Sequence, residues 1–150
     1  MVKTRVPTAQ KDLGSNMVAA VAAGTAVRRL KILVVDDDEL VLLNTVTMLE
    51  DLGHSVIQAN SGQVALTALA GLESVDLLVT DHAMPGMTGA QLAQRVIGER
   101  PRLPVILATG YDELPTGEGQ AYVRLLKPFG QRQLSLAIER ALLSAAALVL

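Results

Sequence analysis

One stretch of the sequence, residues 76–89, constrains the fold more than any other. It begins with a short apolar run, Asp-Leu-Leu-Val-Thr-Asp, which ends in the carboxylate of Asp81, and a loop rich in Pro and Gly follows directly. A short apolar run bounded by turn-forming residues is typical of a buried β-strand. In an open parallel sheet, ligands bind beyond the carboxyl ends of the strands. The stretch therefore predicts that Asp81 lies at the edge of a binding site, unless it only caps the turn.

The rest of the chain repeats this alternation of strand and helix, which predicts a parallel α/β sheet. Further strands are expected at residues 31–36, 54–58, 104–109 and 122–126, and helices at 38–52, 62–71, 89–98 and from 129 or 131 to about 144. Pro115, Gly117 and Gly119 make a long helix between the last two strands improbable. We therefore expect a flavodoxin-like, doubly wound, five-stranded parallel sheet of order 2-1-3-4-5, with its fourth helix short or absent.

The folded domain is expected to span residues 30–146. Residues 1–29, with an Ala-rich run at 17–27, are predicted to be a flexible tail or linker, and residues 147–150 form the C-terminal end. The apolar stretch at 145–150 is expected either to prolong the last helix or to fray. A signal peptide is the alternative for the first segment, but the apolar run begins late and Asp12 interrupts the approach to it. The run is also shorter than the about 20 residues that a membrane span needs, so we expect no membrane association.

The composition excludes several classes of function. The chain has 150 residues, a net charge of −2, no cysteine, two tyrosines and one phenylalanine. So few aromatic residues argue against stacking on single-stranded nucleic acid, and the scattered Lys and Arg residues form no basic patch for DNA. The absence of cysteine removes disulfides and thiolate chemistry and suits a cytoplasmic protein.

Polar residues stand at the ends of four predicted strands. In the expected strand order these ends adjoin, which brings together Asp36, Asp37, Asp81, Thr109 and Lys127. Carboxylates that crowd together repel one another unless a cation neutralises them, and an all-oxygen ligand set favours Mg²⁺. Lys127 and Thr109 suit the oxygens of a transferring phosphoryl group. With no cysteine and no evident Ser-His pair, the expected nucleophile is an Asp, which can form an acyl-phosphate.

Four strings of residues resemble the receiver domain of two-component response regulators, over about residues 31–144. They are Ile-Leu-Val-Val-Asp-Asp-Asp-Glu (32–39), Asp-His-Ala-Met-Pro-Gly-Met-Thr-Gly (81–89), Pro-Val-Ile-Leu-Ala-Thr-Gly (104–110) and Leu-Leu-Lys-Pro-Phe (125–129). The second and third are also similar to receivers of hybrid histidine kinases. The resemblance implies a phosphorelay module that a histidine kinase or a histidine phosphotransfer protein phosphorylates. Such a module catalyses only its own phosphorylation and dephosphorylation, either as a single-domain regulator or as part of a hybrid kinase.

The resemblance also implies how the acidic residues divide their work. Asp81 matches the phospho-acceptor. Asp37 matches the more direct Mg²⁺ ligand, and Asp36 matches an acid that acts largely through water. The backbone carbonyl of Ala83 matches the third protein ligand of the metal.

Near the other strand ends, the sequence both follows and departs from the family pattern. Lys127 matches the phosphate-pairing lysine, whose following peptide bond is usually cis, and Thr109 matches the hydroxyl that responds to phosphorylation. The family often has an aromatic switch residue three positions before the lysine, where this chain has Arg124. We therefore expect the signal to be read from the loop at residues 110–120, with which Arg124 pairs, or from the added charge itself. Tyr111 is a candidate to overhang the site and slow the attack of water.

Two other functions fit part of the same pattern. A phosphohydrolase of the haloacid dehalogenase type also uses a strand-end Asp with Mg²⁺, and Asp36-x-Asp38 fits its Asp-x-Asp motif. Leu40 stands where that motif has Thr or Val, and the cap insertion is missing. The other alternative is an interaction module that is never phosphorylated, against which the full set of five polar residues argues.

Overall fold

A single parallel sheet organises the chain. The computed structural model describes residues 28–72, 74–110 and 122–149. Its sheet has the order β2-β1-β3-β4-β5, and every neighbouring pair of strands is parallel. The strands are β1 (Lys31–Val35), β2 (Ser55–Ala59), β3 (Leu77–Asp81), β4 (Val105–Thr109) and β5 (Val123–Leu126). The predicted fold class and strand order are therefore confirmed.

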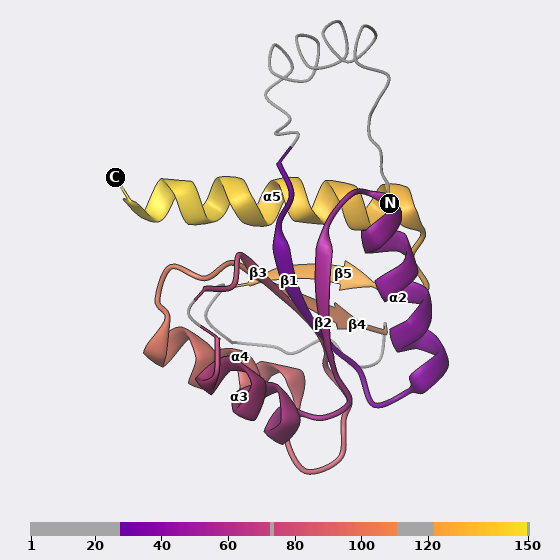
Figure 1. Cartoon of the computed structure of the whole chain (residues 1–150), viewed down its shortest axis with the longest axis vertical. Helices are drawn as coiled ribbons and strands as arrows, with labels where there is room; N and C mark the ends of the chain where they lie inside the picture. Colours follow the sequence, from indigo (N-terminus) through magenta and orange to yellow (C-terminus); the bar gives the residue numbers. More distant parts are fainter. Residues whose placement is uncertain (1–27, 73, 111–121, 150) are drawn as a thin grey trace, which may run out of the picture.

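Helices cover both faces of this sheet. They are α2 (Glu39–Asp51), α3 (Gly62–Ala70), α4 (Gly89–Glu99) and α5 (Gln131–Val149). Helices α2 and α5 pack on one face, and α3 and α4 pack on the other (Figure 1). The segment expected to hold a short or absent fourth helix lies outside the described residues. The last helix continues beyond residue 144 to Val149, as one of the two predicted outcomes had it.

The two faces of the sheet carry two separate hydrophobic cores. Along β1, Ile32 and Val34 join the core under α2 and α5, and Leu33 and Val35 join the core under α3 and α4. Successive side chains of a strand point to opposite faces, and a sheet covered on both sides needs apolar residues on both. This explains why the predicted strands are continuous apolar runs.

Polar caps fix the starts of the helices. The Asp38 carboxylate accepts hydrogen bonds from the backbone N–H groups of Leu40 at 2.9 Å and Val41 at 3.2 Å. Ser61 caps α3, and Thr88 caps α4 in a reciprocal capping box with Gln91. These side chains satisfy N–H groups that have no partner within the helix. They therefore determine where each connecting loop ends.

Two side chains hold the start of β1, which lies at the amino ends of the parallel strands. The backbone N–H of Lys31 donates to the Asp76 carboxylate at 2.8 Å, and the N–H of Leu30 donates to Nδ1 of His54 at 3.2 Å. Burial lowers the pKa of His54, and the positive charge of Arg29 lowers it further. His54 is therefore a neutral hydrogen-bond acceptor.

None of the helices in the described part of the chain is both long enough and apolar enough to cross a bilayer.

Candidate functional site

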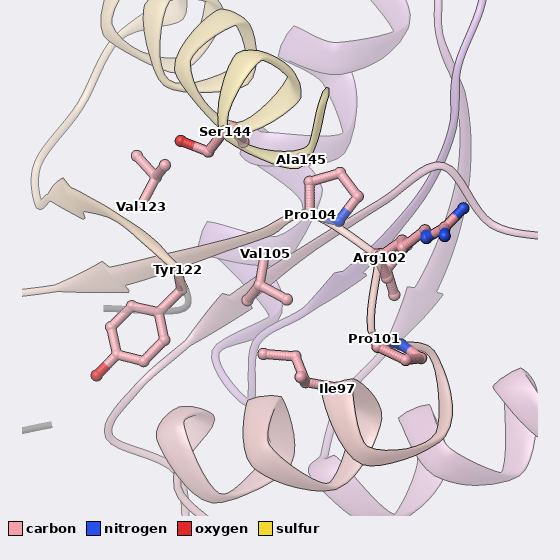
Figure 2. A pocket seen from close by; sticks show the side chains of 11 residues that line it. Ile97, Pro101, Arg102, Pro104, Val105, Tyr122, Val123, Ser144 and Ala145 are labelled. Carbon is pink, nitrogen blue, oxygen red and sulfur yellow. The ribbon is translucent and has the colours of Figure 1, made fainter. Parts of the chain in front are cut away.

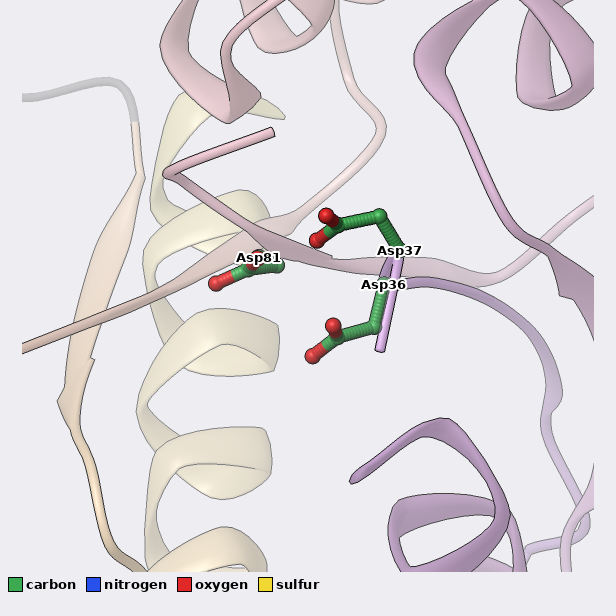
Figure 3. A group of neighbouring side chains, drawn as sticks. All are labelled: Asp36, Asp37 and Asp81. Carbon is green, nitrogen blue, oxygen red and sulfur yellow. The ribbon is translucent and has the colours of Figure 1, made fainter. Parts of the chain in front are cut away.

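Three carboxylates meet at the carboxyl ends of two neighbouring strands. Strands β1 and β3 lie side by side, Asp36 and Asp37 directly follow β1, and Asp81 is the last residue of β3. One carboxylate oxygen from each residue lies within 4.8 Å of the others. Figure 3 shows the carboxylates of Asp36 and Asp37 directed to the side on which Asp81 lies. Asp36 and Asp81 are 5% exposed, whereas Asp37 is open to solvent.

The alternation of the strands explains this convergence. Asp81 continues the series of Leu77 and Val79, which face α2 and α5, and Asp36 continues the series of Ile32 and Val34 on the same face. The backbone N–H of Asp38 donates to Asp36 Oδ1 at 2.9 Å and holds that side chain in place. The acidic group is therefore a direct product of strand register.

Lys127 reaches this acidic group from β5. Its Nζ lies 2.6 Å from Asp81 Oδ1 and 3.5 Å from Asp36 Oδ2. Its backbone N–H donates to the carbonyl of Thr109 at 2.8 Å, which ties the lysine to the end of β4. The peptide bond between Lys127 and Pro128 is cis.

The protonation properties of these groups follow from burial and crowding. Burial raises the pKa of Asp81 above its usual 3.8, and the charges of Asp36 and Asp37 raise it further, against the opposing hydrogen bond from Lys127. Burial also raises the pKa of Asp36, although the Asp38 backbone and Lys127 oppose it. Burial alone would lower the pKa of Lys127, but its hydrogen bonds and ion pairs with Asp81 and Asp36 raise it overall. The group thus has three carboxylates and only one ammonium. A divalent cation would neutralise the excess negative charge.

Thr109 supplies an uncommitted hydroxyl at the carboxyl end of β4, the strand next to β3. It is the last residue of β4 and fully buried, and its Oγ1 has no hydrogen-bond partner among the described residues. Buried hydroxyls usually have a hydrogen-bond partner, because leaving one without a partner costs free energy. The acidic trio, the lysine and this free hydroxyl form a donor set that fits Mg²⁺ and a phosphoryl group.

The remaining predicted residues divide between described and undescribed parts of the chain. Ala83 lies two positions beyond Asp81 and is exposed. Arg124 lies on β5 opposite Leu107 and is partly buried. Tyr111 and the acids at 112, 113 and 118 that were expected to pair with Arg124 lie outside the described residues, so those two predictions stay predictions.

The structure adds Gly89, which the sequence predicted only as the start of a helix, to the residues near the site. Gly89 donates its backbone N–H to the carbonyl of His82 at 2.8 Å. A Cβ at Gly89 would overlap the backbone carbonyl oxygen of Asp81 and lie 2.6 Å from Leu107 Cδ1. A glycine in the first turn of a helix is a poor helix former. The glycine at position 89 is the one sign in the local sequence that the start of α4 lies close to the backbone of Asp81.

A separate hollow lies at the opposite end of the sheet. It has a volume of about 260 Å³, and Ile97, Val105, Tyr122 and Ala141 are among its lining residues (Figure 2). Val105 and Val123 begin their strands, so this hollow opens at the amino ends of β4 and β5. Among the described residues that line it none is acidic, and it is not part of the carboxylate site.

A parallel sheet of this order, with an acidic trio and a lysine at its carboxyl edge, defines a phosphorylation-regulated signalling module. Residues 32–139 match the family described as response regulator receiver domain, and the chain belongs to this family. Such domains are phosphorylated by histidine kinases, and the trio is typical of their Mg²⁺ site. A receiver is regulated by phosphorylation and is not an enzyme that turns over a separate substrate. The resemblance predicted from the sequence is confirmed.

Similar proteins include both regulators and sensors. Regulatory protein AtoC of Escherichia coli K12 is 35% identical over 124 residues, which is 79% of this chain and 26% of that protein. Virulence sensor protein BvgS of Bordetella pertussis is 37% identical over 98 residues, 63% of this chain and 8% of that protein. The matched region thus spans about a quarter or less of these two relatives.

Solved structures agree with the fold. The signal receiver domain of an HD domain-containing protein from Pseudomonas fluorescens has a TM-score of 0.71 at 32% identity, covering 80% of this chain and 99% of that one. The receiver domain of the hybrid histidine kinase CckA has a TM-score of 0.63 at 26% identity, covering 75% of this chain and 98% of that one.

The phosphohydrolase alternative loses its second acid in the structure. Asp38, which completed the Asp-x-Asp motif, caps α2 through Leu40 and Val41 and is not one of the three converging carboxylates.

Proposed function

We propose that Asp81 accepts a phosphoryl group from a phosphohistidine and that the added charge changes the affinity of this chain for a partner protein. The observation that carries the proposal is the convergence of Asp36, Asp37 and Asp81 around one lysine. The two acids from β1, Asp81 itself and the backbone carbonyl of Ala83 would hold Mg²⁺. When bound, Mg²⁺ neutralises charge on the phosphoryl oxygens.

The transfer step is a substitution at phosphorus. A carboxylate oxygen of Asp81 bonds to the phosphorus, the phosphorus–nitrogen bond of the phosphohistidine breaks, and its electron pair returns to the imidazole nitrogen. Asp81 thereby becomes an acyl-phosphate. The modification adds about −1.5 to −2 charge near pH 7, which is enough to reorganise neighbouring groups.

Lys127 and Thr109 receive the new phosphoryl oxygens in this proposal. Lys127 already lies 2.6 Å from the acceptor oxygen, so its ammonium needs little movement to pair with the phosphoryl group. The Thr109 hydroxyl has no hydrogen-bond partner among the described residues and is free to donate to a phosphoryl oxygen. Both contacts are charge-assisted hydrogen bonds, which are stronger than neutral ones.

The donor that we propose is a histidine kinase or a histidine phosphotransfer protein. It must bring an imidazole to Asp81 past the start of α2, where Leu40 is 79% exposed and Leu43 is 58% exposed. A hollow of about 550 Å³ is lined by Leu40, Lys127 and Phe129 among others. Apolar side chains exposed beside the reacting lysine suit an apolar docking surface on the donor. We place this exchange in the cytoplasm.

Incubation with acetyl phosphate and Mg²⁺, followed by intact mass measurement, tests the proposal. We expect one phosphoryl group on the wild type, none on Asp81→Asn, and none when EDTA replaces Mg²⁺. Asp38→Asn is the matched control, because it removes a neighbouring acid that caps α2 and Asn is an equally good cap. That variant should be phosphorylated like the wild type.

Two results would contradict the proposal. A wild type that stays unmodified would favour an interaction module that is never phosphorylated. Continuous release of phosphate from a small ester, with no mark retained on Asp81, would favour a phosphohydrolase. A purified phosphohistidine donor then tests Leu40→Ser, which should slow transfer from the protein donor and leave transfer from acetyl phosphate unchanged.

A further inference from the structure

The loop of residues 82–88, which joins β3 to α4, has a closely determined backbone. The carbonyl of His82 accepts hydrogen bonds from the N–H groups of Met84 at 3.0 Å and Gly89 at 2.8 Å. Gly86 has a φ of 82°, in the left-handed region that favours glycine. The loop therefore begins and ends at the same backbone carbonyl, one residue beyond the acceptor strand.

Two methionines tie this loop to the core under α3 and α4. Met84 is 7% exposed and is part of that core, and Met87 is partly buried against it. Between them Pro85 and Gly86 are exposed, and Ala83 before them is exposed as well. The two methionine side chains thus attach the exposed part of the loop, which includes the Ala83 carbonyl, to this core.

Met87 lies directly over Gly62, the first residue of α3. A Cβ at Gly62 would lie 2.6 Å from Met87 Sδ, 3.1 Å from its Cβ and 3.2 Å from its Cγ. Three atoms of one side chain therefore occupy the place where a side chain at residue 62 would begin. Ser61 caps α3 just before this glycine, so the seat for Met87 is a fixed helix terminus.

We infer that the contact of Met87 with Gly62 is a positioning device that fixes the 82–88 loop, and with it the Ala83 carbonyl, for Mg²⁺ binding. This inference rests on the proposed function for the role of the metal. Met87 and Gly62 are positioning residues, because they act through the loop and not on the phosphoryl group. The device joins α3, which contributes no residue to the acidic trio, to the loop that follows the acceptor.

The physical argument is one of space. A methyl group at residue 62 leaves Met87 no room in its present position, so the outer part of the loop must move. Truncation of Met87 removes the anchor and lets the same part of the loop move freely. The two changes together fit each other, because the new methyl group enters space that the shorter side chain has vacated.

The experiment compares Gly62→Ala, Met87→Ala and the double variant in the full chain. Calorimetric titration with MgCl₂ should show a Mg²⁺ dissociation constant raised roughly tenfold in each single variant, as for other residues that support metal ligands from behind. The double variant should return to within about threefold of the wild type, since residues in contact couple. Gly71→Ala, at the other end of α3, is the matched control, because its Cβ would meet nothing closer than 3.8 Å.

Two further measurements separate positioning from general damage. Hydrogen exchange without Mg²⁺ should be faster at the amides of Met84 and of residues 86–88 in both single variants, and slow again in the double variant. Phosphorylation by acetyl phosphate should need more Mg²⁺ but reach the wild-type rate at saturation. Unchanged Mg²⁺ affinity in both single variants would overturn the inference. So would a double variant whose loss of Mg²⁺ binding free energy equals the sum of the losses in the two single variants. Failure of the wild type itself to bind Mg²⁺ would overturn the proposed function.

Discussion

Asp81→Asn should make the metal-free protein more stable, although it removes an ion pair. Asp81 Oδ1 lies 2.6 Å from Lys127, and this attraction is about 6 kcal/mol at an effective dielectric constant of about 20. Asp36, at up to 4.8 Å, repels it by about 3.5 kcal/mol on the same scale, and the exposed Asp37 adds about 1 kcal/mol in water-like surroundings.

The remaining net attraction, about 1 to 2 kcal/mol, is smaller than the several kcal/mol that burying a carboxylate costs. The raised pKa of Asp81, caused first by burial, has the same sign. Asparagine keeps the shape without the charge, and Lys127 keeps Asp36 at 3.5 Å as a partner. We therefore expect the free energy of unfolding to rise by about 1 to 3 kcal/mol.

Urea unfolding followed by circular dichroism measures this difference, first in EDTA and then in Mg²⁺. At 100 times its dissociation constant, Mg²⁺ adds about 2.7 kcal/mol to a protein that binds it only when folded. The wild type should gain this stabilisation by Mg²⁺ and Asp81→Asn should not. The difference in stability between the two proteins should therefore narrow or change sign. If Asp81→Asn is less stable than the wild type in EDTA, the reasoning about crowded charge at this site is wrong.

Three other changes have defined outcomes. Thr109→Val removes a buried hydroxyl without a partner among the described residues, so stability should rise by up to about 1 kcal/mol in urea unfolding while phosphorylation by acetyl phosphate slows. Gly89→Ala places a methyl group against the carbonyl of Asp81, and unfolding in urea should show a loss of about 1–3 kcal/mol. The pKa of His54 is lowered by burial from 6.5, so stability is full above that pH and falls as pH drops below it, because the unfolded state then binds the proton. In His54→Asn, whose side-chain oxygen can still accept from Leu30 but does not titrate, unfolding curves between pH 7.5 and 5.5 should lose that part of the pH dependence.

Controls for these changes come from the same chain. Gly98→Ala lies within α4 with open space around its Cβ, so it should raise stability by up to about 1 kcal/mol, as expected for alanine in a helix. A loss of stability in Gly98→Ala equal to that of Gly89→Ala would mean that crowding at Asp81 is not the cause. Equal pH dependence in His54→Asn and the wild type would assign the effect to other groups.

The sheet and the acidic group could be predicted because their signals are local. Each strand is a short apolar run, and the period of two along β1 and β3 places Asp36 and Asp81 on one face without knowledge of any other contact. The capping role of Ser61 is equally local.

Contacts between distant segments could not be predicted in this way. Met87 over Gly62, and His54 beneath Leu30, join residues about 25 positions apart and leave no mark on the periodicity. The glycine at position 62 looked like an ordinary helix start, and its lack of a side chain has meaning only once Met87 is seen above it. Sequence alone also gave two outcomes for the end of α5, because the apolar tail from Ala145 fits a continued helix and a frayed end equally well.

The direction of the strands determines where the two described ends of the chain lie. Arg28 and the start of β1 stand at the amino edge of the sheet, and β1, five residues long, separates them from the carboxylates by about 17 Å. Helix α5 begins after Lys127 and runs for 19 residues, about 28 Å, back toward that same edge. Arg28 and the C-terminal end of α5 therefore both lie on the side away from Asp81, and neither of these two described ends covers the proposed phosphorylation site.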